Sequence, residues 1–488
     1  MKINNISKKI SNSMLGYLPV KIIEGIVGFI TLKIYTTLFS PDVYGQYNLI
    51  NPIISFSFLI CLGWLYNSSL RYVNENTKDN KKKKQFFSTM ILTWLSIILI
   101  ILVIYGLLVI FFPGLLNNKD FNLLMILIAV FIGYSMNQIL VSLLLYLGKR
   151  KLNIILVLFS CIAKLLLTIV LYNSLGENVI VIFISHSSID LFTGIIALIA
   201  TNSIPNISLK MYSKNMLIQF LKYGFPLIGL SLTMFLLNIS DRYIINYVYD
   251  KYYVGIYSSN YSVAAAFFTV LMAGMNKGFF PKIIKAWSKK DTKAAEIHLL
   301  YGTRYFLMIS FPAAIGLLVL SQPIGKLFLG IEYFEGNPVI GIIAVAMVFC
   351  GLSEYANKGW ELSSKTLPIL IHCLIATSIN ILLNIILIPR YGYMMAAYTT
   401  LISYIIYFLL SAFHRNKCIK WQIQLKTFIN ILIASIVMFL GVKILINIFT
   451  VNKFNMVIIA LIGAIIYFVT LYIIGEIKTE INQFIKKN

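Results

Sequence analysis

The chain has few charged residues, and its acidic residues are especially scarce. Charged side chains make up 12% of its 488 residues, with 17 Asp and Glu against 41 Lys and Arg, whereas soluble domains carry about 25%. At the same time 59% of the residues are apolar. So few charges could not cover a surface in contact with water, and a soluble globular protein is therefore excluded.

Cysteines and nucleotide-binding motifs are also sparse. The five cysteines form no Cys-x-x-Cys or Cys/His spacing, so we expect no metal site. They lie within the apolar runs or on the side we assign to the cytoplasm, so we expect no disulfide. No Gly-x-x-x-x-Gly-Lys-Ser/Thr sequence occurs, which excludes nucleotide hydrolysis through a P-loop. No connecting segment between the apolar runs is long enough to form a separate catalytic domain. We therefore expect no cofactor and no catalytic site.

Long apolar runs recur along the whole chain. A membrane helix needs about 20 such residues, and a lipid-exposed backbone must satisfy its own hydrogen bonds, which favours helices here. The sequence predicts an all-α integral membrane protein with about 14 transmembrane helices. We place them at 16–38, 44–70, 87–112, 121–147, 152–173, 179–201, 221–248, 254–276, 303–321, 338–357, 366–388, 393–413, 427–448 and 454–475.

Lysine and arginine are unevenly distributed between the two sides of this topology. Thirty of them lie on alternate connecting segments and at the two chain ends, whereas five lie on the opposite segments. Cytoplasmic segments carry such an excess, so we expect a bacterial cytoplasmic (inner) membrane protein with both termini cytoplasmic. Anionic membrane lipids account for clusters such as Lys81–Lys84, and nucleic acid is not an expected partner.

Two hairpins of the chain resemble each other. The first turns at Phe39–Tyr47 and the second at Tyr249–Tyr257, and each has a Gly-x-Tyr after its polar turn, at Gly45 and Gly255. Each repeat holds six spans, so both copies enter from the same side and form parallel lobes, as in transporters. We expect an N-terminal six-helix lobe at 1–201, a cytoplasmic linker at 202–220, a C-terminal six-helix lobe at 221–413, and an appended two-helix hairpin with a cytoplasmic tail at 414–488.

Several short motifs, taken together in this order, carry a family resemblance. They are Asp42-Val-Tyr-Gly45-Gln-Tyr47, Ser240-Asp-Arg242-Tyr-Ile-Ile, Val254-Gly-Ile-Tyr257, Phe280-Pro281, and Ile388-Pro389-Arg-Tyr-Gly392 with Ala396-Ala397. Over nearly its whole length the chain resembles the polysaccharide flippases (O-antigen and capsule type, Wzx-like) of the multidrug/oligosaccharidyl-lipid/polysaccharide exporter superfamily. The resemblance implies a flippase for an undecaprenyl-pyrophosphate-linked oligosaccharide. It does not identify the sugar.

Ionisable residues inside the spans are candidate functional residues, because each costs about 2.5–3.5 kcal/mol to insert at the bilayer centre. Arg242 lies in a polar stripe between Asn238 and Asn246, four residues away on either side. Lys164 and Asp190 lie at similar depth in adjacent antiparallel spans and could meet there. A functional role and a purely structural one are equal alternatives for these two residues. In the structural one they form a buried pair that only sets the register of the two helices.

The first span carries three more such residues. Lys21 and Glu24 lie one turn apart, as a self-paired couple or as part of an entry site, and Lys33 lies further out. Arg and Lys stabilise phosphate by charge-assisted hydrogen bonds. We therefore expect substrate contacts from Arg242, Lys164, Lys33, Lys21, Asn238 and Asn246. The acids Asp190, Glu24 and Asp241 would pair with the cations or bind a coupling ion. Near a span end, Arg304 is interpreted as snorkelling to the interface.

These expectations favour a transporter rather than an enzyme. A flippase working by alternating access would have lipid-linked oligosaccharide, membrane lipids and polysaccharide polymerase machinery as partners. A lipid II flippase and a drug/cation antiporter of the same superfamily are alternatives, and the antiporter would be expected to have an acidic cavity. A membrane polysaccharide polymerase or ligase would need a large outer loop, which the chain does not have.

Overall fold

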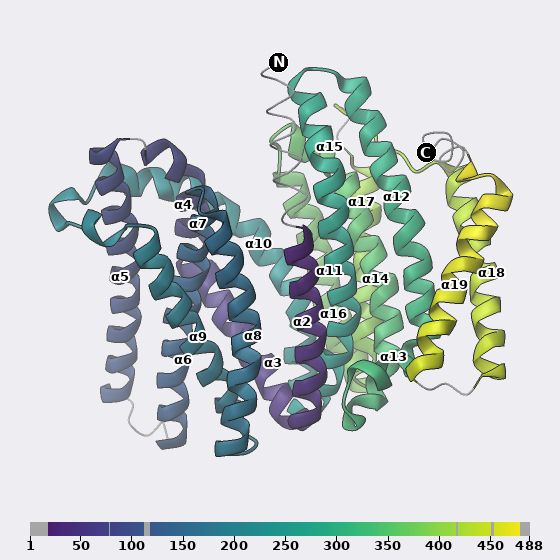
Figure 1. The fold of residues 1–488 in the computed structure, drawn as a ribbon, viewed down its shortest axis with the longest axis horizontal. Coiled ribbons are helices and arrows are strands. Elements are labelled where there is room, and N and C mark those ends of the chain that lie inside the picture. The colour runs from purple at the N-terminus through teal and green to yellow at the C-terminus, as the bar shows by residue number, and fades with distance from the viewer. Residues whose placement is uncertain (1–17, 78, 112–117, 416–417, 450–452, 479–488) are drawn as a thin grey trace. The chain divides into compact units, whose positions relative to one another are not determined.

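The protein consists of long helices in the computed structural model, which describes residues 18–77, 79–111, 118–415, 418–449 and 453–478 (Figure 1). No strand occurs among these residues. Twelve helices in the described part are long and apolar enough to cross a membrane, or 13 if the bent pair α3–α4 forms one span. The predicted all-α membrane fold class is confirmed.

The described chain divides into two compact units. We call residues 46–235 the N-unit, and residues 1–45 together with 236–488 the C-unit. Both boundaries fall inside helices, α3 (Pro41–Cys61) and α10 (Lys214–Val248). This division differs from the expected lobes at 1–201 and 221–413, because α2 (Leu18–Leu38) groups with the second half of the chain.

The N-unit is built from helices that follow one another along the chain. Between the parts of α3 and α10 that belong to it are α4 (Gly63–Asn76), α5 (Asn80–Phe111), α6 (Asn118–Met136), a π-helical turn η2 (Asn137–Val141), α7 (Ser142–Tyr146), α8 (Arg150–Leu175), α9 (Val179–Ala200), η3 (Ile204–Asn206) and η4 (Leu209–Met211). The expected linker at 202–220 is folded, since it holds two 3₁₀ turns and the start of α10.

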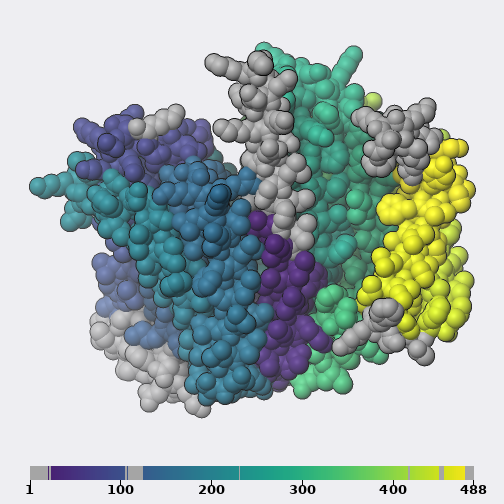
Figure 2. Space-filling model, in the orientation of Figure 1, coloured from purple at the N-terminus to yellow at the C-terminus, as the bar shows by residue number. Residues whose placement is uncertain are grey.

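The C-unit is larger and has α14 at its centre. This helix is buried over most of its length and packs against α11, α12 and α17. Besides α2 and the end of α10, the unit holds α11 (Lys251–Ser288), α12 (Thr292–Val319), α13 (Ser321–Phe328), η5 (Ile331–Gly336), α14 (Asn337–Ala356), α15 (Lys358–Leu362), α16 (Leu367–Tyr391), α17 (Met395–Phe413), α18 (Leu425–Ile448) and α19 (Lys453–Ile474). The last two pair side by side at its edge (Figures 1 and 2).

Short polar residues define where several helices begin. The Asp250 carboxylate accepts hydrogen bonds from the backbone N–H groups of Tyr252 and Tyr253, at 2.9 and 3.2 Å, and so caps α11. Asn178 caps α9 in the same way. At the other end, Gly392 follows α16 with φ +94°, a conformation that favours glycine. These local signals explain why the spans begin and end close to their predicted positions.

Three features depart from a simple series of spans. The second span is broken at Leu62, where α3 and α4 meet at 58°. The seventeen residues between α12 and α14 fold into a short helix, α13, and a 3₁₀ turn, η5. The basic segment 277–300 is helical except at 289–291, so the end of α11 and the start of α12 extend well beyond the expected spans. The break at Leu62 does not interrupt hydrophobicity, which was the signal used to place the spans. The other two features lie in connecting segments, whose fold hydrophobicity does not report.

The two Gly-x-Tyr motifs meet in the C-unit. A Cβ atom on Gly45 would lie 1.8 Å from the Lys251 carbonyl oxygen, and one on Gly255 would lie 2.0 Å from the Pro41 carbonyl oxygen. The contact is symmetric, because Pro41 and Lys251 are separated by the same number of residues as Gly45 and Gly255. The first turns of α3 and α11 therefore cross backbone against backbone, which only glycine permits.

We expect Gly45→Ala and Gly255→Ala each to destabilise the protein by about 1–3 kcal/mol, because the added methyl overpacks a backbone contact. Thermal unfolding of the purified protein in detergent would measure the loss. Gly274→Ala and Gly278→Ala are matched controls on α11, where an added Cβ meets nothing within 4 Å. Equal stability of all four variants would contradict the crossing.

Candidate functional site

A buried ion pair joins two helices of the N-unit. The Lys164 ammonium on α8 lies 2.7 and 2.8 Å from the two carboxylate oxygens of Asp190 on α9. Gly133 of α6 lies against this pair, since a Cβ there would be 3.3 Å from the Asp190 Cβ. On the same face of α9, the His186 ring contacts the edge of the Tyr47 ring at 5.9 Å. The structure thus brings together the two charges that the sequence placed at one depth.

Uncharged polar residues that sequence reasoning missed lie near this pair. The Asn137 amide donates to the Thr193 hydroxyl at 2.5 Å, and the Trp94 indole donates to Ser135 at 3.0 Å. Asn137 begins the π-helical turn η2, and such turns insert a residue and redirect side chains, often at functional sites. Two polar residues within an apolar run, Ser135 and Asn137, were the available signal.

In the C-unit, Asp241 is buried and held by a tyrosine. Its carboxylate accepts a hydrogen bond from the Tyr257 hydroxyl of α11 and another from the backbone N–H of Arg242, at 2.9 Å. We expected Asp241 to pair with a cation or bind an ion, but overlooked Tyr257. This tyrosine is the last residue of the second Gly-x-Tyr motif, which served above to identify the repeat and the family resemblance but not a site residue.

Arg242 is half-buried and lies against an aromatic ring. Its guanidinium carbon is 5.7 Å from the centre of the Tyr261 ring. Its Nε is buried and has no hydrogen-bond partner among the described residues. A buried N–H without an acceptor is costly, so this guanidinium can accept a further anionic or polar partner.

Amide and hydroxyl groups connect Arg242's helix, α10, to α16 and α17. The Asn238 carbonyl oxygen accepts from the hydroxyls of Tyr261 and Tyr404, at 3.2 and 2.9 Å. Two residues further along α10, the Ser240 hydroxyl donates to the Asn380 side-chain oxygen at 3.0 Å. We predicted Asn238 as a site residue but not the tyrosines that orient it. The second half of α10 therefore makes polar contacts with α11, α16 and α17 inside the unit.

The remaining predicted residues lie apart from this cluster. The Lys33 ammonium donates to the backbone carbonyl of Leu329, just after α13, where a cation stabilises the helix end. Glu24 is half-buried on α2, and Asn246 is exposed on α10. The Lys21 side chain lies outside the described residues.

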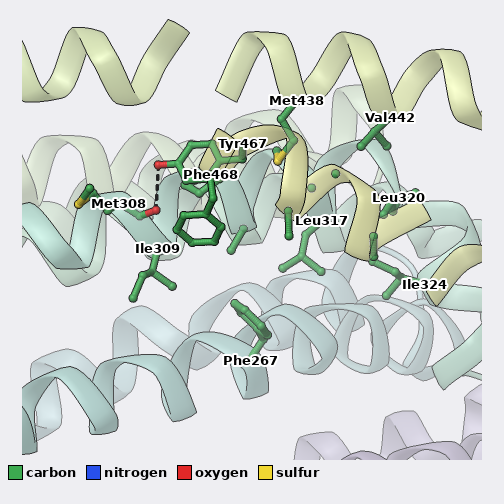
Figure 3. Close-up of a pocket in the computed structure, with 16 residues that line it drawn as sticks. Phe267, Met308, Ile309, Leu317, Leu320, Ile324, Met438, Val442, Tyr467 and Phe468 are labelled. Atoms are coloured by element: carbon green, nitrogen blue, oxygen red, sulfur yellow. Dashed lines mark hydrogen bonds between the residues drawn. The ribbon is translucent and has the colours of Figure 1, made fainter. Parts of the chain in front are cut away.

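An apolar groove of about 360 Å³ runs between the C-terminal hairpin and the rest of the C-unit. Figure 3 shows Met438 of α18 and Tyr467 and Phe468 of α19 on one side, with Ile309 and Leu317 of α12 opposite. The Tyr467 hydroxyl donates to the Met308 carbonyl at 2.9 Å and ties the hairpin to α12. The groove has almost no polar surface, so it suits a hydrocarbon chain.

A polar pocket lies at the end of this hairpin. Arg304 donates to the Glu476 carboxylate at 3.0 Å, and that carboxylate also accepts from Thr427 and Asn430, at 2.8 and 2.7 Å. Our interpretation of Arg304 as a snorkelling residue was therefore wrong. The acceptor lies far along the chain, just beyond the last span, so no helical spacing revealed it.

Two protein-family models match this chain. The family model described as "Polysaccharide biosynthesis protein" matches residues 12–287, more than half of the chain. The chain belongs to this family. A second model, MatE, matches residues 226–386. The expected membership of the exporter superfamily is confirmed, whereas no comparison distinguishes the Wzx-like group within it.

Solved structures share the fold of this family member at low sequence identity. The lipid II flippase MurJ, in an inward closed conformation, superposes with a TM-score of 0.76 at 20% identity, covering 95% of this chain and 99% of MurJ. An inward-facing multidrug resistance MATE transporter gives 0.64 at 12% identity, covering 81% and 93%. An uncharacterized membrane protein of Methanocaldococcus jannaschii is 26% identical over 43% of this chain, and the match spans 42% of that protein.

We expect Glu476→Gln to destabilise the protein by about 3–5 kcal/mol, because it leaves Arg304 charged and buried. The Arg304 and Glu476 side chains are only 12% and 8% exposed. Glu75→Gln is the matched control, since the Arg71–Glu75 pair is 52% and 55% exposed and should contribute about 0–1 kcal/mol. Thermal unfolding of both variants would measure the difference, and equal effects would refute the buried clamp.

The Lys164–Asp190 pair should behave as a unit. We expect Lys164→Met to cost about 3–5 kcal/mol, since it leaves the buried Asp190 carboxylate without its partner. Asp190→Leu should cost less, because Lys164 is 23% exposed, and the double variant should recover much of the loss. A double-mutant cycle on unfolding midpoints would measure the coupling. Additive losses would show that the two charges do not interact.

Proposed function

We propose that the chain is a flippase that translocates an undecaprenyl-pyrophosphate-linked oligosaccharide repeat unit across the bacterial cytoplasmic membrane by alternating access. Its product would supply surface polysaccharide biosynthesis, of O-antigen or capsule type. Membership of the polysaccharide biosynthesis family supports a glycan substrate, and the MurJ-like fold is compatible with a lipid-linked one. The balance of satisfied and unsatisfied charge in the C-unit is the observation that carries the proposal.

In the Asp241–Arg242 cluster the group that still has room for a partner is the cation, so the cluster suits an anion. The Asp241 carboxylate already accepts from Tyr257 and from a backbone N–H, and the Glu476 carboxylate accepts from Arg304. Arg242, in contrast, keeps a buried N–H without an acceptor among the described residues. A pyrophosphate supplies oxygen acceptors in the geometry of a guanidinium, which binds them through two parallel hydrogen bonds. Arg242 is therefore the proposed headgroup contact.

The apolar groove offers a place for the lipid part of the same substrate. Its lining comes mainly from α12, α18 and α19, with Phe267 of α11 and Ile324 of α13, and is almost entirely apolar. A polyprenyl chain in the groove would keep its apolar surface away from the polar cluster while the headgroup crosses. A water-soluble substrate would not need such a groove, so this feature favours a lipid-linked one.

The other predicted residues enter this proposal with different roles. Lys164 and Asp190 would act as a charge pair that opens during transport or as a fixed structural pair. Lys21 would contact the substrate at entry, and Lys33 would hold α13 in place. Transport would proceed by rigid-body movement of two lobes. The polymerase machinery would take up the product. The chain itself would carry out no covalent chemistry. Both termini would lie in the cytoplasm.

Two alternatives remain within the superfamily. A lipid II flippase shares the lipid-pyrophosphate chemistry, so Arg242 and the groove would serve it equally, and the MurJ-like fold is the observation in its favour. A drug/cation antiporter would need an acidic residue available to a cation, whereas Asp190 and Asp241 already have partners. A polymerase or ligase would need an outer catalytic loop.

We expect Arg242→Ala to lower the flipping rate at least tenfold and Arg242→Lys to retain part of it, because lysine keeps the charge but loses the planar pair of donors. The assay would use proteoliposomes holding the lipid-linked oligosaccharide fraction extracted from the source strain. Accessibility of the sugar to a membrane-impermeant glycosidase would report flipping.

Lys443→Ala is the matched control for charge, since Lys443 is exposed on α18. It should flip at the wild-type rate. Retained flipping in Arg242→Ala, or in its combination with Lys164→Ala, would contradict a cationic headgroup site. Transport of lipid II in preference to the extracted oligosaccharide would favour the first alternative.

A further inference from the structure

Tyrosines are concentrated at one end of the C-unit. Seven of them lie between residues 243 and 261. The rings of Tyr249 and Tyr252 lie 5.2 and 5.5 Å from the ring of Tyr253, which in turn lies 5.0 Å from the ring of Tyr393. Two turns far apart in the sequence, α10–α11 and α16–α17, thus share one aromatic cluster.

The backbone beneath these rings is held in place. Asp250 caps α11 and fixes the turn that carries three of the tyrosines. The Tyr249 hydroxyl donates to the Ile388 carbonyl at 3.3 Å, and Gly392 turns the chain after α16. Tyr393 is buried, whereas Tyr249 is exposed and Tyr252 and Tyr253 are half-exposed. The cluster therefore presents pre-organised rings to the exterior.

Two glutamate carboxylates lie beside these rings. The Tyr393 hydroxyl donates to the Glu335 carboxylate at 3.2 Å, and Tyr252 lies within electrostatic range of Glu335 and Glu332. Both glutamates belong to η5 and are exposed. We call Tyr249, Tyr252, Tyr253, Tyr393, Glu332 and Glu335 the tyrosine platform.

We propose that the tyrosine platform binds the oligosaccharide of the substrate on the outer side of the membrane. The electron-rich face of an aromatic ring attracts the partly positive C–H groups of a sugar ring, and tyrosine offers a large rigid surface at low entropic cost. Carboxylates accept hydrogen bonds from sugar hydroxyls. The platform lies on segments poor in Lys and Arg, which indicates the outer side. This inference rests on the proposed function.

An interfacial aromatic belt would also expose tyrosines, but it differs from the platform in two ways. Belt residues are spread around the membrane-facing perimeter and anchor it to lipid headgroups, whereas these rings pack on one another. Two exposed carboxylates beside the rings suit a ligand rich in hydroxyl groups, and they do not favour contact with anionic lipid. The arrangement therefore favours a glycan over a lipid surface.

Chemical footprinting of the wild-type chain in nanodiscs tests the proposal directly. The probe would be the free oligosaccharide released by mild acid from the lipid-linked fraction of the source strain. Tyrosine nitration followed by mass spectrometry should show at least threefold protection of Tyr249 and Tyr252 by the probe. Tyr301 of α12 is an internal control, because it is exposed but lies outside the platform. Equal nitration with and without the probe would overturn the proposal.

Paired variants separate stacking from hydrogen bonding. Binding of the probe, measured by saturation-transfer NMR, should weaken at least fivefold in Tyr249→Leu/Tyr252→Leu and stay within twofold in Tyr249→Phe/Tyr252→Phe, which keeps the rings. If the wild type flips the lipid-linked substrate but the leucine variant binds the probe normally, the platform inference fails and the proposed function stands. If platform binding is lost in the leucine variant while the wild type does not flip, the flippase proposal fails and the glycan site stands.

Discussion

The backbone crossing of α3 and α11 is the contact on which the C-unit depends. Gly45 and Gly255 each face the carbonyl of the residue that begins the other helix, so neither position can carry a side chain. The crossing positions the start of α11, which carries Tyr257 and Tyr261 toward the Asp241 and Arg242 of α10. It also places the α10–α11 turn, and with it the tyrosine platform. One steric constraint, repeated 210 residues apart in the sequence, thus determines the geometry of both candidate binding regions.

The C-terminal hairpin, formed by α18 and α19, is attached to the rest of the C-unit in a different way. It is attached by polar contacts, from Tyr467 to Met308 and from Glu476 to Arg304, while the surface between it and α12 stays apolar. In a membrane, apolar contact with protein and with lipid differ little in free energy, so polar ties and close packing are what hold helices together. The hairpin can therefore stay attached while a hydrocarbon chain occupies the groove beside it.

Much of the fold could be predicted from the sequence, because hydrophobic length and the distribution of Lys and Arg report directly on membrane crossing. Each described helix of span length lies where an apolar run was expected, and the caps at Asn178 and Asp250 are local signals. The break at Leu62 could not be predicted, since it changes direction without changing hydrophobicity. The elements α13 and η5 could not be predicted either, since they fold within a connecting segment, about which span length gives no information. For the site, charge and depth identified Lys164, Asp190 and Arg242. The tyrosine partners of Asp241 and Asn238 were missed because a tyrosine in an apolar run looks like any other large side chain until its hydroxyl is placed.

The central claim is that two sites of the C-unit bind the same molecule: Arg242 binds its anionic headgroup, and the apolar groove binds its lipid chain. A cryo-electron microscopy structure of the chain in nanodiscs with the extracted lipid-linked oligosaccharide tests this most directly. The account predicts pyrophosphate density within hydrogen-bonding distance of the Arg242 guanidinium and continuous chain density between α12 and the α18–α19 hairpin. Pyrophosphate bound elsewhere, with Arg242 facing only Tyr261 and the groove occupied by unrelated lipid, would contradict it.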